Sequence, residues 1–232
     1  MNDSFGGRLV DLVLHPGRLM DNVGAAPRWP AAGLLLFLAM IGFAWLTSPI
    51  SGPEQMEVMR DSKFMRMVPE EQWQQQYEQS MHPKPVSRAV AAVGAGFSTW
   101  IMALVFGLIL GFFARMGGGQ GTMKQAIGIV TWSALIPFTL ASLVKLPLIL
   151  ATESIFRVTF SLASVVPGLE PGDKLFTVLS SFTDFFTIWG LVVLVIGFRR
   201  VFRMSQGAAT TAVVLPWLLL TGAMTAVGLL FM

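Results

Sequence analysis

The chain has 232 residues, of which 54% are hydrophobic and 12% are charged, and its mean hydropathy is +0.66. A soluble domain carries roughly 25% charged residues, so this composition excludes a soluble globular protein. The net charge is only +3 and cysteine is absent, so the sequence gives no support to nucleic-acid binding and excludes disulfides and cysteine-based chemistry.

Residues 1–28 are predicted to be a cytoplasmic N-terminal segment that is retained in the mature protein. They hold three acidic residues and three arginines, which interrupt the apolar core that a cleaved signal peptide requires. Within them, residues 5–14 are typical of a short interfacial helix, with Ser4 as its N-cap and the His-Pro-Gly sequence at 15–17 as its stop. A structureless tail is the alternative.

The uncharged runs of the chain predict where it crosses a lipid bilayer. A hydrocarbon core about 30 Å thick needs roughly 20 apolar residues at about 1.5 Å each. Four runs are long enough, and a fifth, 185–198, must be extended back through Asp184 or forward past Arg199 and Arg200. We therefore expect an all-α polytopic bundle with short interfacial helices and a membrane domain over residues 29–232. The five expected spans are about 30–50, 89–114, 125–145, 178–199 and 208–231.

Residues 51–88 form the one long hydrophilic segment, which we expect on the outer side of the membrane. Pro69 followed by two glutamates favours a helix start, because acids in the first turn face the helix dipole. Trp73 and Tyr77 then share one helix face. Five residues before them also recur at helical spacing: Met56, Met59, Lys63, Phe64 and Met67. We interpret the segment as a helical hairpin that lies on the membrane or on the bundle. The alternative is a docking surface for a membrane-protein partner, since exposed Met and aromatic residues suit adaptable contacts.

A ridge of small residues lies along the second span. Ala103, Gly107 and Gly111 recur at every fourth position, which lets another helix approach closely. We expect this partner helix within the same bundle. Packing between two copies of the chain, and hence a homo-oligomer, is the alternative.

Two prolines interrupt predicted spans. Pro137 and Pro216 should kink their helices, because proline removes a backbone hydrogen bond and leaves a carbonyl that needs a partner. Thr131 and Ser133 are close enough in sequence for their hydroxyls to donate hydrogen bonds to the carbonyls near Pro137.

Lys145 and Asp184 are the ionisable residues that lie nearest to span interiors. Such residues are functional candidates by default, and the predicted topology places both toward the outer leaflet, where they could form a buried pair. The alternative is that Lys145 extends to the interface while Asp184 caps a helix.

Residues 155–166 are apolar apart from Arg157 but are too few to span. We expect an interfacial or re-entrant helix here, with Glu153 and Arg157 paired at the i,i+4 spacing. A sixth span over residues 146–169 is the alternative.

The positions of lysine and arginine predict the orientation. The short loops 115–124 and 199–206 carry five basic residues and no acids, so both should face the cytoplasm. That requires an even number of spans between them, which argues against a sixth span. The N-terminus is then cytoplasmic and Met232 lies on the far side.

No catalytic residue, cofactor-binding residue or metal ligand is expected. His15 and His82 lie outside every span without a second ligand at metal spacing, and no nucleotide-binding or paired-carboxylate motif is present. The three glycines 117–119 lack the Lys-Ser/Thr that phosphate binding requires, so they indicate a flexible turn.

The layout resembles the Yip family of five-span membrane proteins, named for their interaction with Ypt/Rab GTPases, and its bacterial members most. The likeness rests on short elements across most of the chain: 9–29 with Pro16-Gly17-Arg18, 126–147 with Trp132 and Ile136-Pro137, and Trp189, Gly197 and Gln206-Gly207-Ala208. The resemblance implies a five-span fold in a bacterial inner membrane, with the C-terminus in the periplasm. Eukaryotic members act in vesicle traffic through a long cytosolic N-terminal region. Here that region has 28 residues, so Rab binding is not expected, and the family offers no catalytic residues to transfer.

Together these features favour a non-enzymatic inner-membrane scaffold or adaptor, because the spans offer a hydrophilic solute no polar path. The alternative is a small-solute transporter, channel or lipid translocator that uses the kinks and the Lys145 and Asp184 pair. The sequence identifies no partner other than the lipid bilayer.

Overall fold

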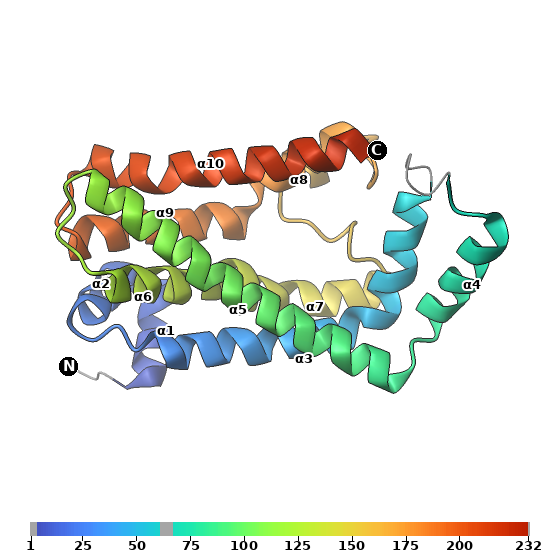
Figure 1. Cartoon of the computed structure of the whole chain (residues 1–232), viewed down its shortest axis with the longest axis horizontal. Coiled ribbons are helices and arrows are strands. Elements are labelled where there is room, and N and C mark those ends of the chain that lie inside the picture. Colours follow the sequence, from blue (N-terminus) through green and yellow to red (C-terminus); the bar gives the residue numbers. More distant parts are fainter. Residues whose placement is uncertain (1–3, 61–66, 232) are drawn as a thin grey trace.

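The computed structural model describes residues 4–60 and 67–231, and over these residues all regular secondary structure is helical (Figure 1). Five helical segments of 25 to 32 residues, with mean hydropathy from 1.9 to 2.1, are long and apolar enough to cross a membrane. The all-α, five-span prediction is therefore confirmed. The segments are α3 (Trp29–Met59), α5 (Pro85–Met116), α6 (Met123–Ala134) continued by η2 (Leu135–Leu140) and α7 (Ala141–Thr152), α8 (Lys174–Thr183) followed by α9 (Phe185–Val201), and α10 (Gln206–Phe231).

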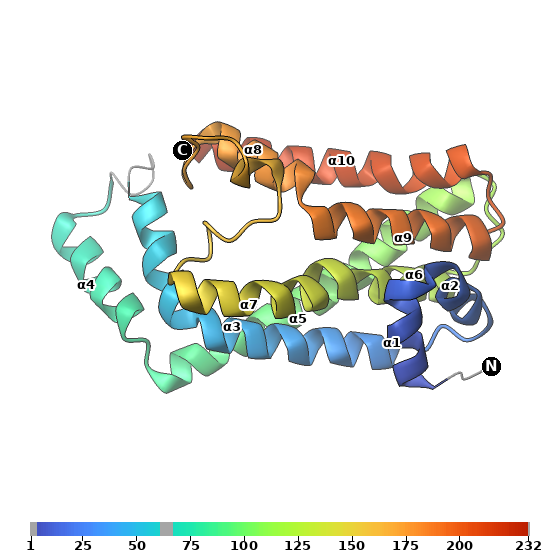
Figure 2. The same ribbon diagram turned by 180° about the vertical axis from the view of Figure 1, so that it is seen from behind.

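Shorter helices lie at the two ends of this bundle. At one end, α1 (Phe5–Leu14) and α2 (Pro16–Ala25) pack beside the turns 117–122 and 202–205; we call this the N-terminal end. At the other, α4 (Glu70–Met81) and residues 153–173 define the α4 end (Figures 1 and 2). In both views α8, α9 and α10 form one layer and α3, α6 and α7 another, while α5 runs diagonally across them.

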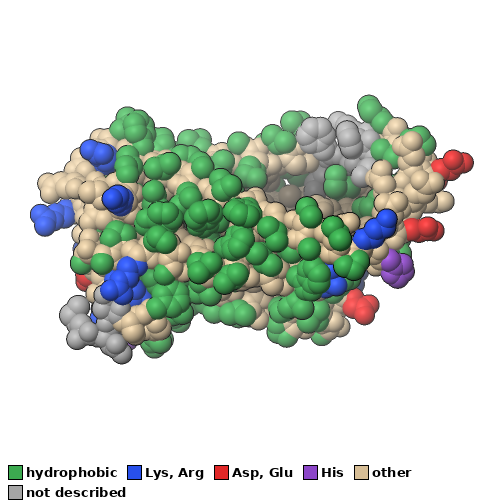
Figure 3. Space-filling view, turned by 60° about the horizontal axis from the view of Figure 1, so that its bottom comes forward, with side chains coloured by type: hydrophobic (Ala, Val, Ile, Leu, Met, Phe, Trp, Pro, Cys, Tyr) green, Lys and Arg blue, Asp and Glu red, His purple; other side chains and the backbone are tan. Residues whose placement is uncertain are grey.

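The surface of the bundle is apolar in its middle and charged at its ends. Figure 3 shows hydrophobic side chains over the central part of one face, with lysine, arginine, acidic and histidine side chains gathered towards the two ends. Large apolar residues on the bundle exterior, such as Leu108 at 48% and Leu219 at 63% exposed, have no protein to cover them. A soluble protein would aggregate with such a surface, whereas a bilayer covers it with lipid chains.

The predicted helix α1 is confirmed, and its cap follows the sequence. The Ser4 hydroxyl accepts a hydrogen bond from the backbone N–H of Gly7 at 3.1 Å, and the helix ends at Leu14, where His15 leaves helical geometry. Pro16 then starts α2, because its fixed φ suits the first turn of a helix. The apolar residues of α2 enter the core: Leu19, Met20 and Val23 are all 0% exposed.

The ridge of small residues on α5 packs against α6 of the same chain. A Cβ placed on Gly107 would lie 2.9 Å from Cα of Ile127, and one on Gly111 would lie 2.7 Å from Cβ of Ala126. Ala103 on the same face is 5% exposed. The close approach of α5 and α6 therefore depends on the absence of side-chain atoms at these positions.

Gly107→Ala should lower the stability of the detergent-solubilised protein by about 1–3 kcal/mol, because the new methyl group meets backbone atoms that cannot move aside cheaply. Gly94→Ala is the control on the same helix, where an added Cβ meets nothing within 4 Å. It should be neutral or stabilising by up to about 1 kcal/mol. Thermal unfolding compares the two, and equal melting temperatures would show that the α5–α6 contact tolerates a side chain at Gly107.

Pro137 is accommodated by a wider helical turn rather than by side-chain hydrogen bonds. It lies in η2, a π-helical turn in which the backbone N–H of Ala141 reaches the carbonyl of Ile136. The expectation that Thr131 and Ser133 would donate to the freed carbonyls is wrong, since both hydroxyls are buried and have no hydrogen-bond partner among the residues that the structure describes. The π-turn changes the carbonyl spacing around the proline and so absorbs the disruption in the backbone itself. Pro216 lies within the continuous helix α10.

The interfacial or re-entrant helix expected over residues 155–166 is wrong. Helix α7 ends at Thr152, Glu153 adopts a left-handed conformation with φ of 50°, and the chain is irregular until the single 3₁₀ turn η3 (Leu162–Ser164). Glu153 and Arg157 therefore do not share a helix, and no sixth span forms over 146–169. The reason is a contact far away in sequence, in which Glu54 binds the backbone of this segment.

The hydrophilic segment 51–88 is largely helical, as its pattern indicates. Helix α3 continues through Pro49 and Pro53 to Met59, and α4 begins at Glu70 with Pro69 as its N-cap residue. The Trp73 and Tyr77 rings stack with centres 5.0 Å apart, so their predicted placement on one face is confirmed. Lys63 and Phe64, which the spacing also assigned to a helix, lie outside the described residues.

Candidate functional site

A cavity of about 530 Å³ lies between α5, η2, α9 and α10. Its walls are mainly apolar and include Phe106, Phe138, Leu191 and Trp217. Met102 of α5 and Leu220 of α10 also line it and are 45% and 43% exposed on the apolar surface of the bundle. The cavity therefore opens sideways between α5 and α10, towards the region that lipid would occupy.

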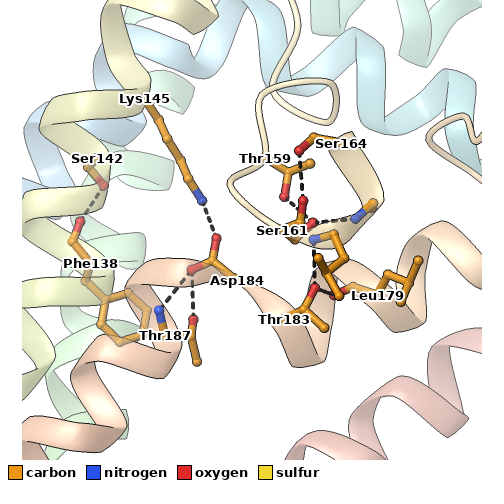
Figure 4. Close-up of polar contacts among 12 residues, drawn as sticks. Phe138, Ser142, Lys145, Thr159, Ser161, Ser164, Leu179, Thr183, Asp184 and Thr187 are labelled. Atoms are coloured by element: carbon orange, nitrogen blue, oxygen red, sulfur yellow. Dashed lines mark hydrogen bonds and ion pairs between the residues drawn. The ribbon is translucent and has the colours of Figure 1, made fainter. Parts of the chain in front are cut away.

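An ion pair lies at the α4 end of this cavity (Figure 4). The Lys145 ammonium donates to Oδ2 of Asp184 at 3.1 Å, and the two side chains are only 23% and 13% exposed. The structure thus brings together the two ionisable residues that the sequence singles out. Each charge stabilises the other where hydration is limited.

Asp184 also determines where α9 begins. The residue has an extended backbone between α8 and α9, and its Oδ1 accepts hydrogen bonds from the backbone N–H and the hydroxyl of Thr187 at 3.0 and 3.1 Å. One carboxylate therefore caps a helix and binds Lys145, so both sequence-based interpretations of Asp184 describe part of its environment. Arg199 lies 15 residues further along the chain, which places Asp184 about 22 Å from it along the helix axis. With Arg199 at one interface of a core about 30 Å thick, this separation corresponds to the third of the core nearer the α4 end.

Two serine hydroxyls at the cavity lack a partner. Ser133 of α6 and Ser180 of α8 both line it, and their Oγ atoms are shielded from solvent without a hydrogen bond in the described part of the chain. Buried hydroxyls are nearly always paired in native proteins. Both hydroxyls therefore keep an unused hydrogen-bonding capacity in the wall of the cavity.

An extended segment covers the cavity at the α4 end. We call residues 153–161 the strap; its residues Ile155 and Phe156 line the cavity. The Glu54 carboxylate of α3 accepts from the Ser154 hydroxyl and from the backbone N–H groups of Ile155 at 2.6 Å and Phe156 at 3.4 Å. The carbonyl of Phe160 in turn accepts from the N–H of Phe185 at 2.8 Å. The strap is thus held at both of its ends.

Glu54→Gln should loosen the strap, because an amide offers these donors one uncharged oxygen in place of a carboxylate. Since the chain has no cysteine, a single Val158→Cys label would report on the strap cleanly. We expect roughly tenfold faster maleimide labelling in the Glu54→Gln background, the scale of one charged hydrogen bond. Glu153→Gln is the control at the same end of the bundle, and an unchanged rate in Glu54→Gln would contradict the assignment.

The N-terminal end of the bundle is closed by α1 and α2. Arg8 is 1% exposed, lies over the Trp132 ring and donates to the carbonyl of Ala26 at 2.8 Å. Trp132 donates through its indole N–H to the carbonyl of Pro27 at 3.0 Å, and Gln125 Nε2 to that of Gly24 at 2.7 Å. The layer beneath is fully buried: Ile129, Trp132, Phe198 and Phe202 are all 0% exposed. The cavity therefore ends within the bundle.

At the α4 end, polar and aromatic contacts hold α4 against α3. The Tyr77 hydroxyl donates to Glu57 Oε1 at 2.6 Å, and this hydrogen bond, more than the loss of hydration, raises the pKa of Tyr77. Arg60 lies 4.5 Å from the centre of the Trp73 ring and pairs with Glu70 at 3.3 Å. These contacts fix the position of α4 on α3.

Sequence reasoning did not identify three of these residues. Arg8 and Glu54 were assigned to polar segments, although Glu54 directly follows the uncharged run that ends at Pro53. Ser180 carries no sequence signal, because its role depends on the cavity. No group of three or more His, Cys, Asp or Glu residues that could hold a metal ion occurs among the residues that the structure describes.

Comparison with known proteins gives one match. A family model described as the Yip1 domain matches residues 10–227, which is nearly the whole chain. No curated protein and no solved structure matches the chain.

Proposed function

Because the chain belongs to the Yip1 domain family, we propose that it is a non-enzymatic scaffold or adaptor of a bacterial inner membrane, which docks a second membrane protein through residues 51–88. The observation that carries this proposal is the form of that segment. It stands out from the bundle as a helix, α4, that packs chiefly on α3 and is braced there by side chains from both helices (Figure 1).

The exposed side chains of this segment support docking. Met59, Met67 and Met81 are 39%, 83% and 46% exposed, and methionine adapts to partners of varied shape. Because α4 is already helical and fixed on α3, its backbone loses little conformational entropy on binding.

The closed N-terminal end supports the scaffold function rather than that of a channel or transporter. A solute that entered the cavity would meet the buried layer around Trp132 and Phe198 before it reached the other side. A lipid translocator is the second candidate, favoured by the lateral opening between Met102 and Leu220.

The charge distribution supports a cytoplasmic N-terminal end. Among described residues that end carries eight basic side chains against the acids Asp11 and Asp21, and the turns 117–122 and 202–205 meet there, with the N–H of Gln120 bound to the carbonyl of Phe202 at 3.0 Å. The positive-inside bias then orients α4 outward. The basic residues are Arg8, Arg18, Arg28, Arg115, Lys124, Arg199, Arg200 and Arg203.

Site-specific photo-crosslinking in native membranes tests the docking role. A photoreactive residue at Gln74 on α4 should give a discrete adduct, whereas one at Val105, which is 48% exposed on α5, should give only lipid adducts. The yield of the Gln74 adduct should fall when Tyr77→Phe and Arg60→Gln remove the side-chain contacts that hold α4 on α3. Identical adduct patterns at the two positions would argue against docking. A separate experiment tests the second candidate: after reconstitution into vesicles, lipid or solute flux well above that of empty vesicles would favour the translocator.

A further inference from the structure

The lining of the cavity is mainly apolar, and its two charged groups lie together towards the α4 end. Phe138, Leu191 and Leu194 form its deeper walls, whereas Lys145 and Asp184 lie at the α4 end. Its volume of about 530 Å³ falls within the range of about 300–1,000 Å³ that is typical of ligand pockets. Such a lining matches an amphiphile, with an apolar chain in the deeper part and a polar headgroup near the ion pair.

The charges at the α4 end of the cavity favour a zwitterionic headgroup. Of the described residues that line it, Lys145 is the one cation and Asp184 the one anion. The ammonium of Lys145 has three donors and gives one to Asp184, so two remain for a phosphate oxygen. The Asp184 carboxylate also keeps a free acceptor position beyond its bonds to Lys145 and Thr187, which suits an ammonium donor. An anionic headgroup would satisfy Lys145 but would be repelled by Asp184.

Ser180 gives an independent indication of a ligand. It lies four residues before Asp184 and lines the cavity, and its Oγ is buried without a hydrogen-bond partner in the described part of the chain. A phosphate or ester oxygen next to Lys145 would accept the hydrogen bond that the protein leaves unmade.

The position of the cavity identifies the bilayer as the source of the ligand. The opening between Met102 and Leu220 lies on the apolar surface of the bundle. The ion pair is in the third of the core nearer the α4 end, which is close to the headgroups of that leaflet. A lipid can therefore enter sideways while its headgroup stays near its normal depth.

We propose that this cavity binds one zwitterionic glycerophospholipid with a primary ammonium group, of the phosphatidylethanolamine type. Lys145 and Ser180 bind its phosphate, Asp184 binds its ammonium, and one acyl chain fills the space between α5, η2 and α9. This site is separate from the docking surface at α4, and its occupancy does not depend on a protein partner.

Lipid retention tests the proposal. The full chain is purified in mild detergent, exposed to equal amounts of phosphatidylethanolamine and phosphatidylglycerol, washed, and its bound lipid measured by mass spectrometry. We expect about one phospholipid per chain, with roughly tenfold preference for phosphatidylethanolamine, the scale of one charged hydrogen bond. Leu191→Trp places a larger ring in the wall of the cavity and should reduce retention, while Val192→Trp should not, because Val192 is 52% exposed on the same helix and does not line the cavity.

A second variant keeps the test decisive if Leu191→Trp does not fold. The double variant Lys145→Met with Asp184→Asn replaces the ion pair by neutral side chains of similar size, and it should retain lipid without a headgroup preference. The proposal is overturned if the wild type retains no phospholipid, if it binds both headgroups equally, if Leu191→Trp retains as much lipid as Val192→Trp, or if the double variant keeps the preference.

Discussion

Asp184→Asn should destabilise the detergent-solubilised protein by about 2–3 kcal/mol, and Lys145→Met by a similar amount, because each leaves the other charge unpaired in a place with little hydration. Asparagine caps helices as well as aspartate does, so the bond to the N–H of Thr187 is retained and the loss reports on the charge. Thermal and denaturant unfolding of the single variants measure this effect.

The double variant Lys145→Met with Asp184→Asn completes a double-mutant cycle, which measures the interaction between the two residues. It should recover most of the lost stability, because no isolated charge remains. Lys124→Met, at an exposed position on α6, serves as the control for loss of a lysine. An unchanged melting temperature in Asp184→Asn, or a double variant that loses the sum of both single effects, would contradict the structural role of the pair.

Arg8→Met should release α1 and α2 from the bundle and lower stability by about 2–4 kcal/mol. The guanidinium of Arg8 serves the carbonyls of Ala26 at 2.8 Å and Asn22 at 3.4 Å at the end of α2. Without it the Ala26 carbonyl loses its charged donor, which costs about 1–3 kcal/mol, and the Trp132 ring loses the cation that lies over it. The Asn22 carbonyl keeps its bond from the N–H of Ala26. Unfolding experiments and limited proteolysis between α2 and α3 measure the effect.

Arg115→Met is the matched control for this prediction. Arg115 is exposed in the last turn of α5 at the same end of the bundle, so its loss should change stability by less than about 1 kcal/mol. If Arg8→Met were no more sensitive to protease or heat than Arg115→Met, the burial of Arg8 would not contribute to the closure of the N-terminal end.

The parts of the fold that depend on local pattern could be predicted from the sequence. Helix α1 follows from Ser4 and the His-Pro-Gly stop, α4 from Pro69 and the two glutamates after it, and four of the five long helical segments from uncharged runs. These signals lie within a few residues of the element that they specify. Periodicity and capping therefore suffice to locate it.

The strap shows why the remainder could not be predicted. Its residues are as apolar as those of a short helix, but Glu54 lies about 100 residues earlier and binds three of its donors. These bonds hold the start of the strap in an irregular conformation, in competition with the helix that its apolar residues would otherwise form. No local pattern contains that competition, and the same holds for Arg8, whose burial depends on Trp132.

The sequence predicts the two charged residues of the candidate site but not the cavity beside them. Lys145 and Asp184 are conspicuous because ionisable residues are rare in apolar spans, and the structure places them 3.1 Å apart. The cavity arises from how the diagonal helix α5 diverges from α10, together with the π-turn at Pro137. The significance of Ser180 depends on that packing, so it became visible only with the three-dimensional arrangement.

The outward docking surface at α4 requires a chain that crosses the membrane five times with its N-terminal end in the cytoplasm. Because the chain has no cysteine, single-cysteine variants Gln75→Cys on α4 and Gln120→Cys in the turn between α5 and α6 can be labelled selectively with a membrane-impermeant maleimide. We expect Gln75→Cys to react in intact spheroplasts and Gln120→Cys to react only after permeabilisation. Labelling of both positions from the same side, or the reverse pattern, would contradict the proposed topology.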